Sequence, residues 1–134
     1  MSTLQKHSGP VADFYAPADN RYPFSEAVRV GDTIYLAGQL GIGPDGLVQG
    51  FDAQVRQMMD NVAATLRKLD LGMEHLVKCT VFMADLSQWQ AFNAIYVEYF
   101  EPGFYPARAA FGATELALGA DVEIDCIACA PQRA

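Results

Sequence analysis

The sequence predicts a single α+β domain in which two helices cover one face of a mixed β-sheet. Two helical segments with strong apolar periodicity are separated by short runs typical of strands, in the order strands, helix, strand, helix, strands. Chains with this pattern bury their apolar faces in a two-layer structure. The 134 residues suffice for one domain, residues 1–134, with a core of its own.

The N-terminal third is expected to begin as an extended arm and then to form a hairpin. Residues 1–20 mix prolines with polar side chains, and they predict an extended N-terminal arm. Residues 27–30 and 33–36 are β-rich runs on either side of Gly31-Asp32, which is typical of a hairpin. The glycine-rich residues 38–46 are predicted to form loops and turns.

The first helix is predicted between Asp52, as its N-cap, and Gly72, as its C-cap. Apolar side chains recur there at intervals of three and four residues, which is the spacing of one helix face. These residues are Val55, Met58, Met59, Val62, Leu66 and Leu69.

A strand, a second helix and two further strands complete the chain. Residues 76–84 alternate as a strand does, and Ser87 with Gln90 forms a capping-box pattern for the second helix. That helix carries an aromatic stripe, which we interpret as a core face. The last two strands are predicted near residues 107–114 and 121–130.

Composition narrows the possible partners and cellular location. The net charge of −7 and the absence of a Lys/Arg run argue against nucleic-acid binding and RNA cleavage. We find no signal-peptide pattern in residues 1–10 and no apolar run of bilayer length, so we expect a cytoplasmic protein without membrane contact. A sheet covered on one face only, in a chain that is 51% hydrophobic, is expected to bury its other face against copies of itself.

Arg108 is the strongest candidate for a binding residue. It lies in the otherwise uncharged residues 104–111. A guanidinium among apolar neighbours needs a partner, and it can hold a carboxylate through two parallel hydrogen bonds. A structural ion pair with a carboxylate on a neighbouring strand is the alternative explanation.

Glu123 is the second candidate. Strand alternation places Asp121, Glu123 and Asp125 on one face and Val122, Ile124 and Cys126 on the other. Such an acidic face is usually solvated, but a Glu123 that points into a cleft can position or deprotonate a water molecule. Glu123 and Arg108 either form a structural pair or share a cleft with substrate between them.

No motif indicates a metal or an organic cofactor. Cys126 and Cys129 form a C-x-x-C sequence, but residues three apart on a strand point to opposite faces, so their sulfurs diverge. The glycines of residues 38–46 match neither a P-loop nor a dinucleotide-binding fingerprint. The odd number of cysteines argues against a disulfide framework.

Several segments, in order, resemble the RidA/YjgF family, also called the translation initiation inhibitor or endoribonuclease L-PSP family. Residues 22–32 (YPFSEAVRVGD) are similar to the family's G-P-Y-S-Q-A-V-x-x-G-[ND], and residues 35–39 (YLAGQ) to its [SA]-G-Q. Further similar segments are residues 77–86 (VKCTVFMADL), 105–108 (YPAR) and 122–128 (VEIDCIA). The similarity spans residues 20–130.

This resemblance implies a chorismate-mutase-like fold, a homotrimer with clefts between subunits, and hydrolysis of 2-aminoacrylate and related imines to 2-keto acids and ammonia without a cofactor or metal. It implies that Arg108 binds the substrate carboxylate and that Glu123 handles the attacking water. Gly38, Asn93, Phe24 and Tyr105 are expected to bind substrate in the same cleft.

The chain departs from the family pattern in the lining of the cleft. Phe24 stands where most members have Tyr, Ala109 follows Arg108 where Ser or Thr is preferred, and Gly112 stands where many deaminases carry Glu. Two alternatives to 2-aminoacrylate deamination therefore stay open. One is a specialised 2-aminomuconate-type deaminase. The other is a non-catalytic trimer that binds small carboxylates or acts as a chaperone-like protein.

Overall fold

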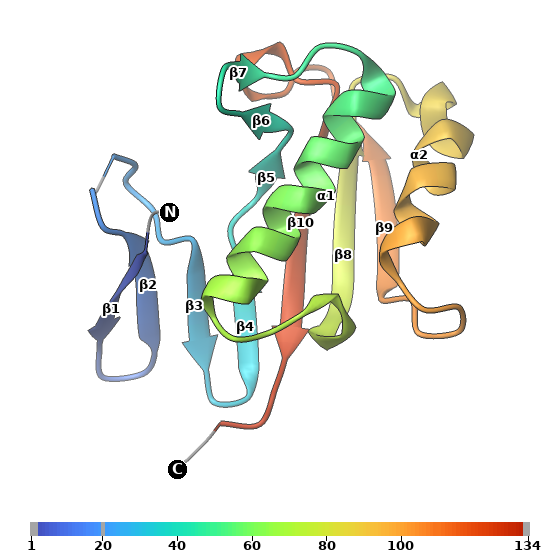
Figure 1. The fold of residues 1–134 in the computed structure, drawn as a ribbon. Helices are drawn as coiled ribbons and strands as arrows, with labels where there is room; N and C mark the ends of the chain where they lie inside the picture. Colours follow the sequence, from blue (N-terminus) through green and yellow to red (C-terminus); the bar gives the residue numbers. More distant parts are fainter. Residues whose placement is uncertain (1–2, 20, 133–134) are drawn as a thin grey trace.

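The computed structural model describes residues 3–19 and 21–132, and it has the predicted two-layer α+β architecture (Figure 1). Eight strands form one sheet in the order β1-β2-β3-β4-β10-β8-β9, and β5 extends the pairing of β10. These strands are β1 (Leu4–Ser8), β2 (Asp13–Pro17), β3 (Ala27–Val30), β4 (Thr33–Leu36), β5 (Gln39–Leu40), β8 (Leu76–Met83), β9 (Ala107–Gly112) and β10 (Val122–Cys129). Only β8 and β9 pair in parallel, which makes the sheet mixed.

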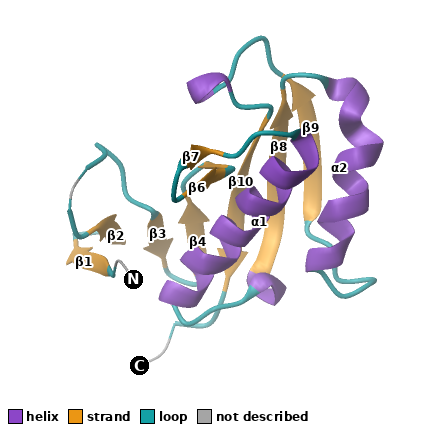
Figure 2. Cartoon of the chain, turned by 45° about the horizontal axis from the view of Figure 1, so that its top comes forward, coloured by secondary structure: helices purple, strands orange, loops and turns teal. Residues whose placement is uncertain are grey.

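Two helices lie on one side of this sheet (Figure 2). Helix α1 spans Phe51–Lys68 and helix α2 spans Trp89–Tyr96. Short 3₁₀ turns connect the elements: η1 (Met73–His75), η2 (Leu86–Gln88), η3 (Val97–Tyr99) and η4 (Ala117–Gly119). A small separate ribbon of β6 (Ile42–Gly43) and β7 (Gly46–Leu47) precedes α1. None of the helices in residues 3–19 and 21–132 is long and apolar enough to cross a bilayer.

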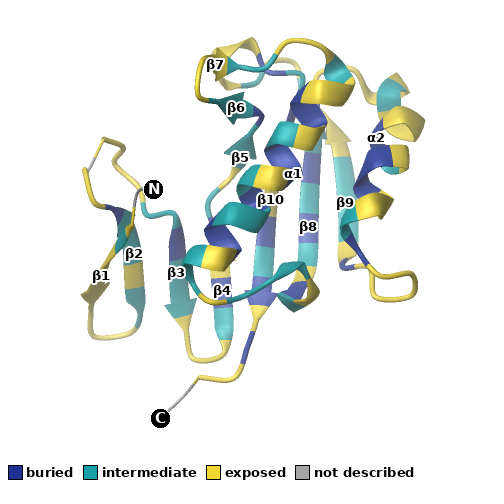
Figure 3. Cartoon of the chain, viewed as in Figure 1, coloured by how far each residue is buried: buried dark blue, intermediate teal, exposed yellow. Residues whose placement is uncertain are grey.

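The core lies between α1, α2 and the covered face of the sheet. The predicted apolar stripe of α1 is buried against the sheet, as Figure 3 shows. On β10 the buried residues are Val122, Ile124, Cys126 and Ala128, whereas Glu123, Asp125, Ile127 and Cys129 face the other way. The predicted alternation along this strand is therefore confirmed.

The ends of α1 differ from the prediction. The helix begins after Gly50, whose φ of 92° suits glycine, and Asp52 lies in the first turn instead of capping it. It ends at Lys68, before the predicted stop at Gly72, because Asp70 takes a φ of 60°. The acidic Asp52 still lies near the positive end of the helix dipole.

The capping box predicted for the second helix is absent. The side chain of Asp85 accepts hydrogen bonds from the backbone N–H (3.0 Å) and hydroxyl (2.6 Å) of Ser87. This cap initiates η2, from which the chain continues into α2 at Trp89. Ser87 is thus held by a cap and does not provide one.

The N-terminal segment, which was predicted to be an extended arm, forms two paired strands. Within residues 3–19, β1 and β2 form an antiparallel hairpin, and β2 pairs with β3, with Phe14 opposite Val28. The arm is therefore an edge of the main sheet, as Figure 1 shows. This pairing joins segments that are distant in sequence, so local patterns do not report it.

Candidate active site

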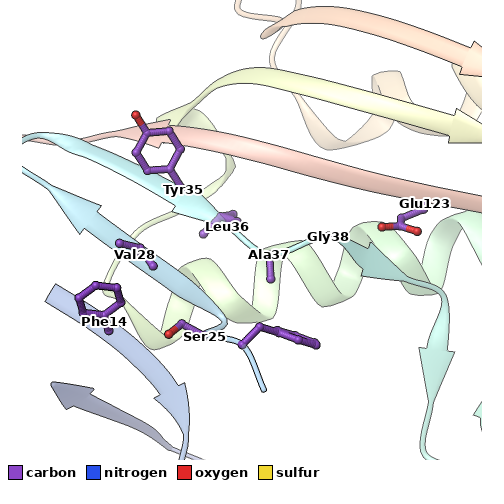
Figure 4. A pocket seen from close by; sticks show the side chains of 9 residues that line it. Phe14, Ser25, Val28, Tyr35, Leu36, Ala37, Gly38 and Glu123 are labelled. Carbon is purple, nitrogen blue, oxygen red and sulfur yellow. The ribbon is translucent and has the colours of Figure 1, made fainter. Parts of the chain in front are cut away.

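Three of the predicted site residues line one open cavity on the uncovered face of the sheet (Figure 4). Phe24, Gly38 and Glu123 border this cavity of about 590 Å³. Its other walls are largely apolar, and they are formed by Phe14, Ser25, Val28, Tyr35, Leu36 and Ala37. The arrangement places a single acidic group in a largely apolar hollow.

Gly38 and Glu123 fit together as a unit. Because β5 pairs with β10, with Leu40 opposite Glu123, the chain just before β5 passes beside the Glu123 side chain. A Cβ atom placed on Gly38 would lie 2.5 Å from Oε2 of Glu123, closer than real Cβ contacts. The carboxylate therefore occupies space that any other residue at position 38 would fill. Figure 4 shows the Glu123 carboxylate directed toward the backbone at Gly38.

The environment of Glu123 raises the pKa of its carboxyl group. Partial burial raises the pKa of the Glu123 carboxyl above its ordinary value, and the negative charge of Asp125 on the same face raises it further. A carboxyl with a raised pKa holds and releases a proton closer to neutral pH. Glu123 is thus suited to exchange a proton with a bound water molecule or substrate.

Phe24 contributes a ring and no polar group. Its ring stacks on Tyr22, with centroids 5.2 Å apart and planes inclined by 7°. The Phe24 side chain is half-exposed, and it also borders a neighbouring cavity of about 390 Å³ that shares Ala37 and Gly38. This wall of the site makes apolar or stacking contacts only.

Arg108 lies elsewhere, at the edge of the sheet beneath α2. It is on β9, the outermost strand, directly opposite Cys79 of β8. Its guanidinium carbon is 4.8 Å from the ring centroid of Tyr96, 5.1 Å from that of Trp89 and 5.6 Å from that of Phe92. Among the described residues, no carboxylate forms a salt bridge with Arg108, so the alternative of a structural ion pair within the chain is not supported.

The two remaining predicted residues lie on the same side as Arg108. Asn93 belongs to α2, and its Oδ1 is buried without a hydrogen-bond partner among the described residues. Tyr105 precedes β9, is half-exposed, and meets the ring of Phe100 edge-on at 6.3 Å. Arg108, Asn93 and Tyr105 therefore form a second group at the β9 edge.

The sheet separates the two groups. Cys79, the register partner of Arg108, is fully buried and pairs with the buried Cys126, so Arg108 belongs to the helix-covered face. Glu123 pairs with Phe82 and belongs to the uncovered face. One copy of the chain consequently does not bring Arg108 and Glu123 to the same ligand.

Two features of this region escaped the sequence interpretation. Cys79 and Cys126 place their Sγ atoms 3.4 Å apart in the core, a pairing that appears only once β8 and β10 are known to be neighbours. The aromatic stripe of α2 is a core face at Phe92 and Tyr96, as predicted, but Trp89 is 41% exposed.

No cluster of three or more His, Cys, Asp or Glu side chains suited to a metal occurs in the described part of the chain.

Comparison with known proteins places the chain among similar sequences and structures. Residues 16–130 match the family model described as endoribonuclease L-PSP. A RutC family protein of Aquifex aeolicus is 40% identical over 109 residues, covering 79% of this chain and 87% of that protein. The human 2-iminobutanoate/2-iminopropanoate deaminase is 38% identical over 109 residues, covering 79% of each chain. The crystal structure of RidA from an Antarctic Psychrobacter species superposes with a TM-score of 0.77 at 36% identity, covering 82% of this chain and 90% of that one.

Proposed function

Because this chain belongs to the RidA/YjgF family, which the endoribonuclease L-PSP model describes, we propose that it is an enamine/imine deaminase. It hydrolyses 2-aminoacrylate-type imino acids to 2-keto acids and ammonia, and it works as a cofactor-independent homotrimer in the cytoplasm. One observation carries the proposal. Arg108, which has no salt-bridge partner within residues 3–19 and 21–132, and Glu123, whose pKa is raised by burial, stand at two surfaces that a second copy can join.

The chemistry needs few groups. Arg108 binds the substrate carboxylate through two hydrogen bonds and so fixes the position of the imine carbon. Water attacks that carbon while Glu123 accepts a proton from the water oxygen. Glu123 returns this proton to the nitrogen, which gives a carbinolamine. It then takes the proton of the new hydroxyl group and passes it to the nitrogen as the C–N bond breaks, so the carbonyl forms and ammonia leaves. Such imines hydrolyse in water unaided, so positioning and one proton relay supply enough rate acceleration.

A neighbouring copy completes the site. Phe14, Val30, Tyr35 and Phe111 are large apolar side chains on the uncovered face, and each is 38–54% exposed. Burial of such a face against identical chains is the common way to remove it from water. The β9 edge of one copy, with Arg108, then meets the Glu123 cavity of the next.

Subunit mixing tests this arrangement. Arg108→Ala and Glu123→Gln proteins are each expected to fold, to stay trimeric and to lose most of the acceleration of ammonia release from freshly generated 2-aminoacrylate over the uncatalysed rate. When equal amounts of the two are unfolded and refolded together, each cleft takes position 108 from one subunit and position 123 from the next at random, so about a quarter of the clefts hold both native residues. Recovery of about a quarter of wild-type activity supports the shared site. An active Arg108→Ala protein, or no recovery on mixing, contradicts it.

The lining of the cavity favours a second candidate function, which is binding of small carboxylates without catalysis. Phe24 lacks the hydroxyl of the usual family residue, and the surrounding walls are largely apolar. A trimer that binds small carboxylates without turnover would use the same groups. Ammonia release faster than the uncatalysed rate separates the two functions, and a substrate panel that includes 2-aminomuconate separates a specialised deaminase from a general one.

A further inference from the structure

The surroundings of Arg108 contain a feature that the deaminase proposal does not use. Three aromatic rings of α2 enclose its guanidinium at 4.8–5.6 Å from their centroids. Trp89, Phe92 and Tyr96 are spaced at i, i+3 and i+7, so they share the face of α2 that lies over β9. We define these three side chains as the aromatic cage.

The cage has a rigid base and an open rim. Phe92 is fully buried and Tyr96 is 3% exposed, so the core fixes both rings. Trp89, by contrast, is 41% exposed at the first position of α2. It is therefore the one ring of the cage that both contacts the guanidinium and borders solvent.

The rings stabilise the charge of Arg108 without neutralising it. Aromatic faces attract a cation through their quadrupole and leave the N–H groups at the guanidinium edge free to donate hydrogen bonds. Burial raises the pKa of the Tyr96 phenol, so this ring stays neutral beside the guanidinium. A carboxylate in place of any ring would pair with Arg108 and compete with an incoming ligand.

We propose that Trp89 is a positioning residue, which holds the Arg108 guanidinium in the orientation that receives a substrate carboxylate. An arginine side chain has many rotamers, and a bound carboxylate must otherwise bear the cost of ordering it. The indole, whose ring centroid lies 5.1 Å from the guanidinium carbon, removes much of this freedom in advance. This inference rests on the proposed function, because it assumes that Arg108 binds the substrate.

The same contact provides a reporter of binding. Trp89 is the only tryptophan in the sequence, and it lies 5.1 Å from the guanidinium carbon. A carboxylate that reaches Arg108 changes the electrostatic environment of this one indole. Titration with 2-oxobutanoate, a 2-keto acid product, is therefore expected to give a saturable change in intrinsic fluorescence, and Arg108→Ala is expected to abolish it.

The test compares Trp89→Leu with the conservative Trp89→Phe. Loss of one cage ring is expected to raise KM for the imine, and the inhibition constant of 2-oxobutanoate, by about fivefold to thirtyfold, with a smaller change in kcat. Trp89→Phe, which restores a ring face, is expected to lie within about threefold of wild type. Val97→Ala, a truncation at a side chain 44% exposed just after α2, is the matched control and is expected to behave as wild type.

The outcomes separate this inference from the proposed function. An active Arg108→Ala protein contradicts the proposed function itself. If Arg108→Ala is inactive while Trp89→Leu keeps the wild-type KM, only the positioning role is wrong. The positioning role is equally contradicted if Trp89→Phe loses as much affinity as Trp89→Leu, or if 2-oxobutanoate inhibits the wild-type enzyme without any change in Trp89 fluorescence. Thermal melting and oligomer size, measured for every variant, identify a merely structural loss.

Discussion

Replacement of Gly38 by alanine isolates the placement of the Glu123 carboxylate. The new Cβ would lie 2.5 Å from Oε2 of Glu123, whereas ordinary contacts begin near 3.4 Å, so the carboxylate must retreat by about 0.9 Å. Gly38 does not have a positive φ, and the atom in the way is the tip of a flexible side chain. We therefore expect Gly38→Ala to fold and Glu123 to rotate away.

The magnitude follows from the sensitivity of catalysis to geometry. A misplacement of about 1 Å in a catalytic group costs roughly 100-fold in rate. We expect kcat for ammonia release from 2-iminobutanoate to fall by about that factor, with little change in KM, because the carboxylate contacts of Arg108 are untouched. The imine is generated in the cuvette by an amino-acid oxidase, and ammonia release is followed by a coupled dehydrogenase.

Two comparisons make the result decisive. At Gly43 the nearest atom to a new Cβ is Oε1 of Gln57 at 3.3 Å, far from Glu123, so Gly43→Ala is expected to retain wild-type kcat. The double variant Gly38→Ala/Glu123→Gln is expected to have the same kcat as Glu123→Gln alone, since both changes act on the same carboxylate. A Gly38→Ala enzyme with wild-type kcat would refute the role assigned to this contact.

Three further outcomes follow from the charges and thiols of the same strands. Asp125→Asn removes a charge that raises the pKa of Glu123, so the acid limb of the kcat/KM profile is expected to move to lower pH. Because the pKa of Glu123 is raised in the folded protein, the folded state is most stable below the ordinary pKa of a glutamate and loses this stability as the pH rises through the folded-state pKa. Glu123→Gln, which carries no charge at any pH, is therefore expected to melt at a higher temperature than wild type at pH 7 and at the same temperature at pH 3. A thiol reagent under native conditions is expected to leave Cys79 and Cys126 unmodified, because they are 0% and 3% exposed, and rapid modification of either would contradict the buried pair.

Local patterns predicted the elements well and their ends poorly. The hairpin of β3 and β4, the apolar stripe of α1 and the alternation along β10 follow from periodicity that one segment carries by itself. The start of α1 depends instead on the backbone of Gly50, and its end on the left-handed conformation of Asp70. Side-chain type alone predicted Asp52 and Gly72 at those places, because it does not report which residue adopts the special backbone angles.

The same distinction applies to the candidate site. The sequence predicts that Glu123 lies opposite to Ile124 and Cys126, because all three belong to one strand. It does not predict whether Glu123 and Arg108 lie on the same side of the sheet, because the two residues belong to strands that do not pair with each other. Their relative orientation depends on β8, which pairs in parallel with β9 and antiparallel with β10. Only that three-strand register places the two residues on opposite sides of the sheet.

This separation explains how one small domain keeps both groups available. An arginine and a glutamate within reach of each other in the same copy would form an ion pair, which would lower the pKa of the carboxyl and occupy the guanidinium. With the sheet between them, Glu123 keeps its raised pKa in a largely apolar cavity, and the guanidinium of Arg108 lies against aromatic rings. Each group is held in a state that favours a ligand over an internal partner. In the trimer that we propose, the boundary between two copies is the place where one substrate reaches both groups.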